Sequence, residues 1–192
     1  MNEVKNSTAA YGPGHGFEVN GDRSKLTNNT ATGAGCDIAP LPMDGILIHV
    51  GSSLGEYTHN VANDNCGNGI NNEGSTNKIN NNVVAGNVQR GIRSHDSDNN
   101  QIIGNAAVNN SDGIRLGSGS VDNLVRGNRT YGNWDDGIDV NGTTNTITEN
   151  ISLGNGNHDL EDDNATCDSN IWTSNTFGTS DANGTPSPAC IN

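Results

Sequence analysis

Arginine, histidine and carboxylate side chains recur at matching places along this chain, just after a repeated Gly-Ile pair. In an extended strand the isoleucine would point inward, and the residue after it would point outward. This alternation assigns Arg93 and Arg115 to one outward column and His95 to the next. A guanidinium group binds a carboxylate through two parallel hydrogen bonds, and an imidazole can remove a proton from carbon. These three residues are therefore the candidate catalytic groups for an acidic substrate.

The same two outward columns hold the candidate substrate-binding residues, which are Asn71, Glu73, Asp139 and Glu161. Together the columns form a ribbon with cations in its middle and carboxylates at one end, which suits an acidic sugar chain. The alternative is an ordinary exposed sheet face whose cross-strand charge pairs serve solubility and strand pairing. Like charges on neighbouring strands are mildly destabilising, so the pair Arg93 and Arg115 favours the functional interpretation without deciding between the two.

Clustered carboxylates make calcium a candidate cofactor, although no motif requires one. The candidate ligands are Asp135, Asp136 and Asp163, in two alternative groups: Asp135 and Asp136 with Asp139, or the acidic run 159–164 that contains Asp163. Calcium takes several oxygen ligands, but this spacing matches no defined calcium loop. Asp112 and Asp136 are at least as well explained as turn residues that bond their own backbone. The five histidines are dispersed, which argues against a copper site.

A repeat of 22 or 23 residues must position these side chains. An apolar column marks the repeat, and a column made almost entirely of asparagine follows it three residues later. The apolar column is Val4, Leu26, Tyr57, Ile79, Ile102, Val125, Ile147 and Trp172. The second column is Ser7, Asn29, Asn60, Asn82, Asn105, Asn128, Asn150 and Asn175. The longer step of 31 residues from Asn29 to Asn60 marks an insertion.

Short apolar-alternating runs separated by Asn, Gly and Asp predict strands and turns, not helices. Such strands can all pair if the chain coils and equivalent strands stack in parallel, about 4.8 Å apart. The prediction is an all-β, right-handed parallel β-helix solenoid of about seven coils of 22–23 residues, with no N-terminal cap helix. Asparagines at a repeated turn would form a side-chain ladder. Disorder, the alternative for so polar a chain, does not explain the apolar column.

The repeat predicts one domain over 1–192, with an inserted loop within 30–58 and a C-terminal closure over 164–192. The four cysteines form no C-x-x-C pair, which excludes zinc spacing. Disulfides Cys36–Cys66 and Cys167–Cys190 would close the two irregular segments, and free buried thiols are the alternative. Disulfides persist in oxidising compartments, so the expected location is secreted or at the cell surface. No signal peptide is evident, because Met1 leads directly into polar residues.

The charge balance limits the partners. The net charge is -13 with nine Lys and Arg and no basic run, which argues against nucleic acid. No segment approaches the roughly 18 consecutive apolar residues of a membrane span. An acidic surface instead fits calcium binding or solubility.

The rungs resemble the family of right-handed parallel β-helix repeat proteins. This family includes pectate-lyase-like enzymes, alginate epimerases and lyases, phage tailspikes and the periplasmic copper-binding protein that matures nitrous oxide reductase. The likeness covers nearly the whole chain, and its clearest copies are Asp112-Gly113-Ile114 and the rung 127–133. It implies the fold and leaves several activities open, because one fold hosts many chemistries.

Residues 91–96, Gly-Ile-Arg-Ser-His-Asp, are similar to the alginate epimerase motif, with His95 on the family histidine. Arg93 and Ser94 stand where that motif has its catalytic Asp and its Pro, and Gly117 stands where the next rung has a second Asp. The resemblance therefore does not carry the epimerase catalytic residues to this chain.

Two functional hypotheses follow. The first is a carbohydrate-active or carbohydrate-binding β-helix that acts on an acidic polysaccharide along the face of Arg93, Arg115 and Asp139, as a lyase or uronate epimerase if it is catalytic. The second is a non-catalytic structural, adhesive or self-stacking module. Residue 1 falls in the middle of a coil, and uncovered strand edges associate. Either self-association or stacking on further coils of a longer parent chain is therefore expected at the uncapped N-terminal coil.

Overall fold

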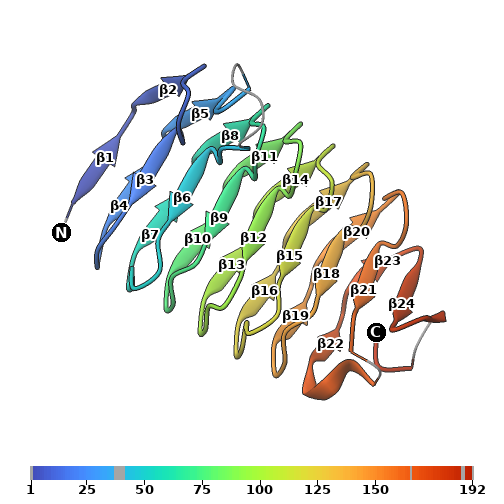
Figure 1. Cartoon of the computed structure of the whole chain (residues 1–192). Coiled ribbons are helices and arrows are strands. Elements are labelled where there is room, and N and C mark those ends of the chain that lie inside the picture. Colours follow the sequence, from blue (N-terminus) through green and yellow to red (C-terminus); the bar gives the residue numbers. More distant parts are fainter. Residues whose placement is uncertain (1, 37–41, 165, 187–188, 192) are drawn as a thin grey trace.

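The chain winds into a parallel β-helix of eight coils, and each coil contributes one short strand to each of three sheets (Figure 1). The computed structural model describes residues 2–36, 42–164, 166–186 and 189–191. The predicted all-β, right-handed parallel solenoid is confirmed, with eight coils where about seven were expected. No helix in these described ranges is long and apolar enough to cross a membrane.

The three sheets run along the stack and are named A, B and C. Sheet A contains β1 (Glu3–Lys5), β4 (Lys25–Thr27), β7 (Glu56–Thr58), β10 (Lys78–Asn80), β13 (Gln101–Ile103), β16 (Leu124–Arg126), β19 (Thr146–Thr148) and β22 (Ile171–Thr173). Sheet B contains β2 (Thr8–Ala10), β5 (Thr30–Thr32), β8 (Val61–Asn63), β11 (Val83–Ala85), β14 (Ala106–Val108), β17 (Arg129–Tyr131), β20 (Ile151–Leu153) and β23 (Thr176–Phe177). Sheet C contains β3 (Phe17–Val19), β6 (Ile46–Ile48), β9 (Ile70–Asn72), β12 (Ile92–Ser94), β15 (Ile114–Leu116), β18 (Ile138–Val140), β21 (Leu160–Asp162), β24 (Ser180–Ala182) and the antiparallel β25 (Thr185–Pro186).

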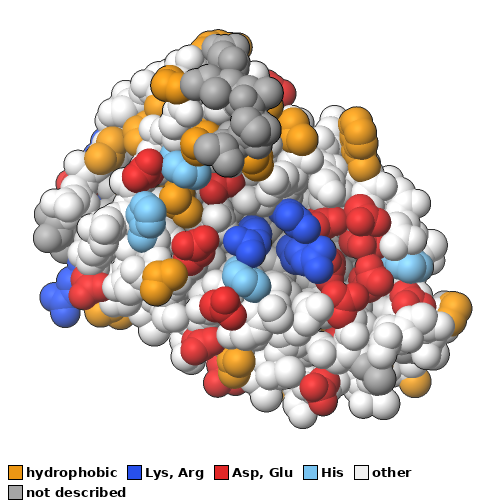
Figure 2. Space-filling view, in the orientation of Figure 1, with side chains coloured by type: hydrophobic (Ala, Val, Ile, Leu, Met, Phe, Trp, Pro, Cys, Tyr) orange, Lys and Arg blue, Asp and Glu red, His pale blue; other side chains and the backbone are white. Residues whose placement is uncertain are grey.

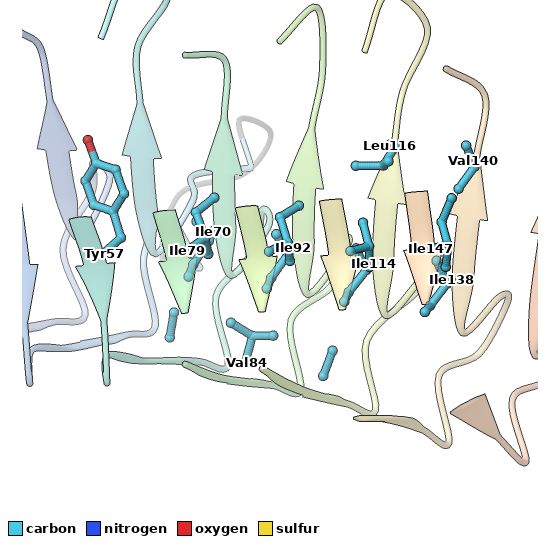
Figure 3. Packing of buried hydrophobic residues seen from close by; sticks show 14 of the residues in the cluster. Tyr57, Ile70, Ile79, Val84, Ile92, Ile114, Leu116, Ile138, Val140 and Ile147 are labelled. Atoms are coloured by element: carbon cyan, nitrogen blue, oxygen red, sulfur yellow. The ribbon is translucent and has the colours of Figure 1, made fainter. Parts of the chain in front are cut away.

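The interior is a narrow column of stacked apolar side chains. Each strand of sheet A turns its middle residue inward, so that Ile79 pairs with Tyr57 on one side and with Ile102 on the other. All three side chains are fully buried. Figure 3 shows the isoleucines of sheets A and C meeting along this interior. Such a core needs few apolar residues per coil, which explains how so polar a chain can fold.

Asparagine side chains form three ladders along the stack, where the sequence predicted one. In the second ladder, Asn82 donates from its backbone N and from Nδ2 to Oδ1 of Asn105, at 2.9 and 3.0 Å. Asn105 makes the same two bonds to Asn128. The first ladder is Asn77, Asn100, Asn123, Asn145 and Asn170, and the third is Asn65, Asn87, Asn110, Asn133 and Asn155. The ladders satisfy backbone groups at all three corners of the coil, which buried polar groups require.

Each corner combines a ladder asparagine with a preceding residue in the left-handed conformation. Gly104 has φ of 67° before Asn105, and Asn109 has φ of 55° before Asn110. Glycine and asparagine adopt this conformation at a lower cost than other residues. A separate glycine column precedes sheet C, where a Cβ on Gly91 would lie 2.6 Å from the carbonyl oxygen of Gly113. Close stacking of the coils therefore explains the repeated Gly-Ile pairs.

The disulfides Cys36–Cys66 and Cys167–Cys190 are present, as the sequence predicted, with Cα–Cα distances of 5.1 and 6.2 Å. Near the end of the chain, Cys167 opens a short 3₁₀ turn, η1 (Cys167–Ser169). Residues 1, 37–41, 165, 187–188 and 192 lie outside the described residues, so the predicted domain 1–192, insert 30–58 and closure 164–192 are described in part. Self-association through the N-terminal coil stays a prediction.

Candidate functional site

The outward side of sheet C carries the predicted ribbon of polar side chains. The register pairs Arg93 with Asn71 on one side and with Arg115 on the other. It then pairs Arg115 with Asp139, and Asp139 with Glu161. The order of these five residues along the rod is therefore the one that the repeat predicted. We call this surface the sheet C face.

Three arginines gather in the middle of the sheet C face, and carboxylates lie directly beside them toward the C-terminal coils (Figure 2). Nη1 of Arg115 lies 2.9 Å from Oδ2 of Asp139 and 3.7 Å from Oδ2 of Asp112. Arg90 donates from Nε to the same Asp112 oxygen at 3.0 Å. Burial acts to lower the pKa of Arg115, but the neighbouring carboxylates, led by Asp139, raise it above its ordinary value. Arg90 and Arg115 are thus held by carboxylates.

Arg93 is less completely neutralised. Its Nη1 donates to Oδ1 of Asn71 at 3.2 Å and lies 4.0 Å from Oε1 of Glu73. Burial and the charge of Arg90 lower the pKa of Arg93. The side chain keeps about a quarter of its surface exposed, at 25%. Arg93 therefore presents a guanidinium group that an external anion could bind.

His95 follows Arg93 by two residues and lies on the same face, in the next outward column. Its Nε2 lies 3.2 Å from Oδ2 of Asp96, and the imidazole is partly exposed. On the next coil, a Cβ at Gly117 would overlap the imidazole ring. The absence of a side chain at residue 117 thus leaves the room that His95 occupies.

Five carboxylates and one imidazole meet at the C-terminal side of the arginines. Their ligand atoms form three overlapping groups, with all atoms of a group within 4.8 Å of one another. The groups are Asp112, Asp136 and Asp139; Asp139, Glu161 and Asp163; and Asp136, His158 and Glu161. We call these six residues the acidic cluster. Asp112, Asp136 and Asp139 are buried, whereas Glu161 and Asp163 are partly exposed and give solvent access.

Crowding of these carboxylates shifts their ionisation. Burial raises the pKa of Asp139 to about 8, although Arg115 opposes the shift. Burial, a hydrogen bond with Asp136 and the surrounding negative charges raise the pKa of Glu161 to about 9. Burial and Asp136 also raise the pKa of Asp135. The cluster therefore resists holding all of its negative charges without a counter-charge.

Three atoms of the acidic cluster lack a hydrogen-bond partner within the described ranges: Oδ1 of Asp112, Oδ1 of Asp139 and Nδ1 of His158. Asp112 and Asp139 are only 1% and 2% exposed. Other residues of the column before Gly-Ile use the equivalent oxygen to accept from the next coil, as Oδ1 of Asp136 does from the backbone N of His158 at 2.9 Å. The Asp112 oxygen breaks this pattern.

The predicted metal ligands are only partly brought together. Asp136 and Asp163 belong to the acidic cluster, whereas Asp135 is exposed and belongs to none of the three groups. The acidic run 159–164 is split by strand alternation. Asp162 points inward and accepts from Nε1 of Trp172 at 2.8 Å, and Asp159 accepts from the backbone of Gly178 and Thr179. Asp136 bonds the next coil and not its own turn, contrary to the expectation for a turn residue.

The predicted substrate-binding residues differ in how much surface they offer. Glu73 and Glu161 are partly exposed, but Asn71 and Asp139 are buried. Asn71 accepts from Arg93 and Asp139 faces Arg115, so both hold an arginine in position.

Three residues of this region were not identified from the sequence as candidates for function. Arg90 and Asp112 belong to the column immediately before the Gly-Ile pair, and the charged residues that this column carries on three successive coils, Arg90, Asp112 and Asp136, were the available signal. Trp134 is 83% exposed and borders a hollow of about 140 Å³ with Val88, Asn109 and Ser111. The signal for Trp134 was an indole placed two residues before Asp136, at a corner where the neighbouring coils carry Ser111 and Gly156.

Comparison with known families gives an extended match. The family model described as periplasmic copper-binding protein (NosD) matches residues 1–187. No curated protein matches the sequence.

Solved structures share the fold at low sequence identity. A double mutant of the periplasmic alginate epimerase AlgG superposes with a TM-score of 0.72 at 19% identity, over 91% of this chain and 44% of that chain. The A-module of the Azotobacter vinelandii mannuronan C-5 epimerase AlgE4 gives 0.70 at 14% identity, over 91% and 52%. The Dettilon tailspike protein gives 0.54 at 14% identity, over 91% and 46%. This chain thus spans about half the length of these proteins, and the likeness shows a common fold.

Proposed function

Because the chain belongs to the periplasmic copper-binding protein (NosD) family, whose match spans the whole β-helix, we propose that it is an extracytoplasmic β-helix whose sheet C face binds an acidic polysaccharide. The two disulfides support an oxidising compartment. The matched family is described as periplasmic, and so is the structurally similar AlgG epimerase. Secretion to the medium or display at the cell surface is the narrower form of the same proposal.

The observation that carries the proposal is the arginine group. Arg93 and Arg115 stack on adjacent coils, and like charges so placed destabilise a sheet unless an anion lies between or above them. Arg115 directly contacts carboxylates, whereas Arg93 contacts the amide of Asn71, lies 4.0 Å from a Glu73 oxygen and interacts with Asp44 only through its charge. A carboxylate of a uronate chain would complete the coordination of Arg93, since guanidinium and carboxylate groups match in geometry.

A polymer is favoured over a small ligand because the face is long and repetitive. Strands stack about 4.8 Å apart, so polar side chains recur along the rod as sugar residues recur along a chain. Two of the similar structures are named as alginate or mannuronan epimerases. The exposed Trp134 adds an apolar ring of the kind that packs against a sugar face.

Catalysis is a narrower hypothesis that the same face could support. His95, held by Asp96, is the group placed to remove the C5 proton of a bound uronate. Arg93 and Arg115 would neutralise the substrate carboxylate as that proton leaves, a requirement of both lyases and epimerases.

Copper, which the family description implies, does not fit the donors found in this chain. All four cysteines are paired in disulfides. In the described part of the chain, each potential metal group consists of carboxylates with at most one imidazole, that of His158. Copper sites are built mainly from imidazole and sulfur ligands. No part of the proposed function depends on copper.

The test is binding of pectate and alginate, with dextran as a neutral polymer, measured by affinity electrophoresis and calorimetry. We expect Arg93→Ala to weaken binding about tenfold, the effect of removing roughly 1.4 kcal/mol of ion pairing. Arg129→Ala is the matched control, because Arg129 is exposed on sheet B and carries the same charge. Absence of binding to both acidic polymers, or equal effects of the two substitutions, would overturn the proposal.

Activity is read on the same samples. An unsaturated uronate formed by elimination absorbs in the ultraviolet, and epimerisation in deuterated water exchanges the C5 proton. Loss of either signal in His95→Ala, with polymer binding retained, would assign His95 a catalytic role.

A further inference from the structure

The acidic cluster contains more carboxyl groups than its neighbouring arginines can balance in their ionised form. Five carboxylates meet there, and the guanidinium groups in contact with them are those of Arg90 and Arg115. Arg90 pairs with Asp112, and Arg115 is shared among Asp112, Asp139 and Asp163, so in the described chain no guanidinium group contacts Asp136 or Glu161. Buried charges are normally paired or bound to a metal.

Unsatisfied oxygens give a second, independent indication. Oδ1 of Asp112 and Oδ1 of Asp139 are buried without a hydrogen-bond partner in the described chain. Both belong to one group of three carboxylates whose ligand atoms lie within 4.8 Å of one another. A buried acceptor without a donor costs about 1–3 kcal/mol. A cation at this position would satisfy both oxygens together.

From these two observations we infer that the acidic cluster is a binding site for one divalent cation that prefers oxygen ligands, with calcium the best match. The centre of the site consists of Asp136, Asp139 and Glu161. Every pair of these three residues occurs together in one of the three groups. Asp112 and Asp163 complete it on either side.

The ligand chemistry selects among metals. Calcium accepts several carboxylates at once, in flexible geometry, whereas magnesium keeps much of its water and demands a regular octahedron. The described cluster offers a single nitrogen ligand, His158, and no sulfur. Zinc and copper, which favour nitrogen and sulfur, are therefore poorer matches.

The cation would enter from the sheet C face. Glu161 and Asp163 are the partly exposed carboxylates of the cluster, and Asp163 lies 3.8 Å from Arg115. A bound calcium would place a second positive centre beside the arginines, where an acidic polymer could share it. Cation binding itself does not rest on the proposed polysaccharide binding and is measured without any polymer.

The experiment is calorimetric titration of the chelator-treated protein with calcium chloride, at a salt concentration that screens exposed charges. We expect one site per chain with a dissociation constant of about 10⁻⁴ M, as in extracellular calcium modules. Calcium should also raise the melting temperature, because a ligand bound only by the folded state stabilises it.

The decisive variant is Asp139→Asn with Glu161→Gln, which removes two central charges and keeps the side-chain shapes. Its matched control is Asp122→Asn with Glu149→Gln, which removes two charges from exposed positions elsewhere on the rod. We expect at least a tenfold loss of calcium affinity in the first and none in the second. Glu161→Gln alone, at a partly exposed position, provides the test if the double variant folds poorly.

Three results would overturn the inference. They are the absence of calcium binding by the unaltered protein, equal weakening in the decisive and control variants, and a loss in His158→Gln as large as in the decisive variant. The last result would indicate a nitrogen-ligated metal. Calcium binding without polymer binding would leave this site intact and reject only the proposed function.

Discussion

Nη1 of Arg115 lies 2.9 Å from Oδ2 of Asp139, while Oδ1 of the same carboxylate has no hydrogen-bond partner among the described residues. The two carboxylate oxygens of Asp139 therefore have different surroundings. Oδ2 holds an arginine of the proposed polymer site, whereas Oδ1 is buried without a partner, and the carboxylate as a whole belongs to the acidic cluster. Any change in the charge of Asp139 should be felt at both sites, since the two share one buried carboxylate.

The stability of the cation-free protein should fall as the pH rises from about 4 to about 9. The pKa of Asp139 is raised to about 8 and that of Glu161 to about 9 in the folded chain. Unfolded carboxyls titrate near 4, so the folded state binds more protons across this interval. The stabilisation is complete below the unfolded pKa and is lost as the pH passes through the folded pKa. Urea denaturation in the presence of a chelator measures the change.

The variant Asp139→Asn with Glu161→Gln should flatten this pH dependence, because both titrating groups are gone. The double variant Asp122→Asn with Glu149→Gln should keep it. A stability that rises between pH 5 and pH 9 in chelator would contradict the raised pKa values.

Replacing Asn105 by alanine should destabilise the fold by about 3 kcal/mol or more. The substitution removes four buried hydrogen bonds: the two that Oδ1 of Asn105 accepts from the backbone N and Nδ2 of Asn82, and the two that Nδ2 of Asn105 donates to Oδ1 of Asn128 and to the carbonyl oxygen of Ile79. Denaturant unfolding gives the change in free energy. Asn157→Ala, at an exposed asparagine, should stay within about 0.5 kcal/mol of the unaltered protein.

Opening the disulfide Cys167–Cys190 should lower the free energy of unfolding by about 3 kcal/mol. The bond closes a loop with a sequence separation of 23, and its loss restores conformational freedom to the unfolded chain. Cys167→Ser with Cys190→Ser, compared by thermal melting under non-reducing conditions, isolates this bond from Cys36–Cys66. An unchanged melting temperature would show that the bond adds no stability.

Trp134→Ala should weaken binding of acidic polymers several-fold and leave stability within about 0.5 kcal/mol. The ring is 83% exposed and so contributes little to packing, whereas Trp172 is buried in the core. Polymer binding should also change the fluorescence that Trp134 adds to that of Trp172. Unchanged affinity in Trp134→Ala would remove the indole from the binding surface.

The fold could be predicted from the sequence because each coil repeats the same residue types, apolar residues, asparagines and glycines, at nearly the same spacing. The stacking of Ile79 on Tyr57 and the order of Arg93, Arg115 and Asp139 follow once the period and the strand alternation are known. Two of the three ladders were missed, although asparagines recur at a spacing of five within most coils, as in Asn100, Asn105 and Asn110. Only one asparagine column was aligned.

The acidic cluster was harder to predict because it depends on where side chains turn at corners. Contiguity in sequence suggested 159–164, yet alternation sends Asp162 inward and Glu161 outward. Asp112 precedes a glycine, and sequence alone does not say whether its carboxylate closes a turn or faces the next coil. Only the folded structure determines that Oδ1 of Asp112 is buried without a hydrogen-bond partner among the described residues.

The asparagine ladders make the coils structurally equivalent. Each amide oxygen accepts a hydrogen bond from the coil before it, and each amide nitrogen donates one to the coil after it. A duplicated coil would meet the same partners above and below, and the rod would lengthen by about 4.8 Å without a new interface. A copy of 100–122 would add one more arginine to the face, whereas a copy of 123–144 would add carboxylates. Gene-level duplication or deletion of single coils could thus retune the charge sequence of the surface while the scaffold beneath it stays the same.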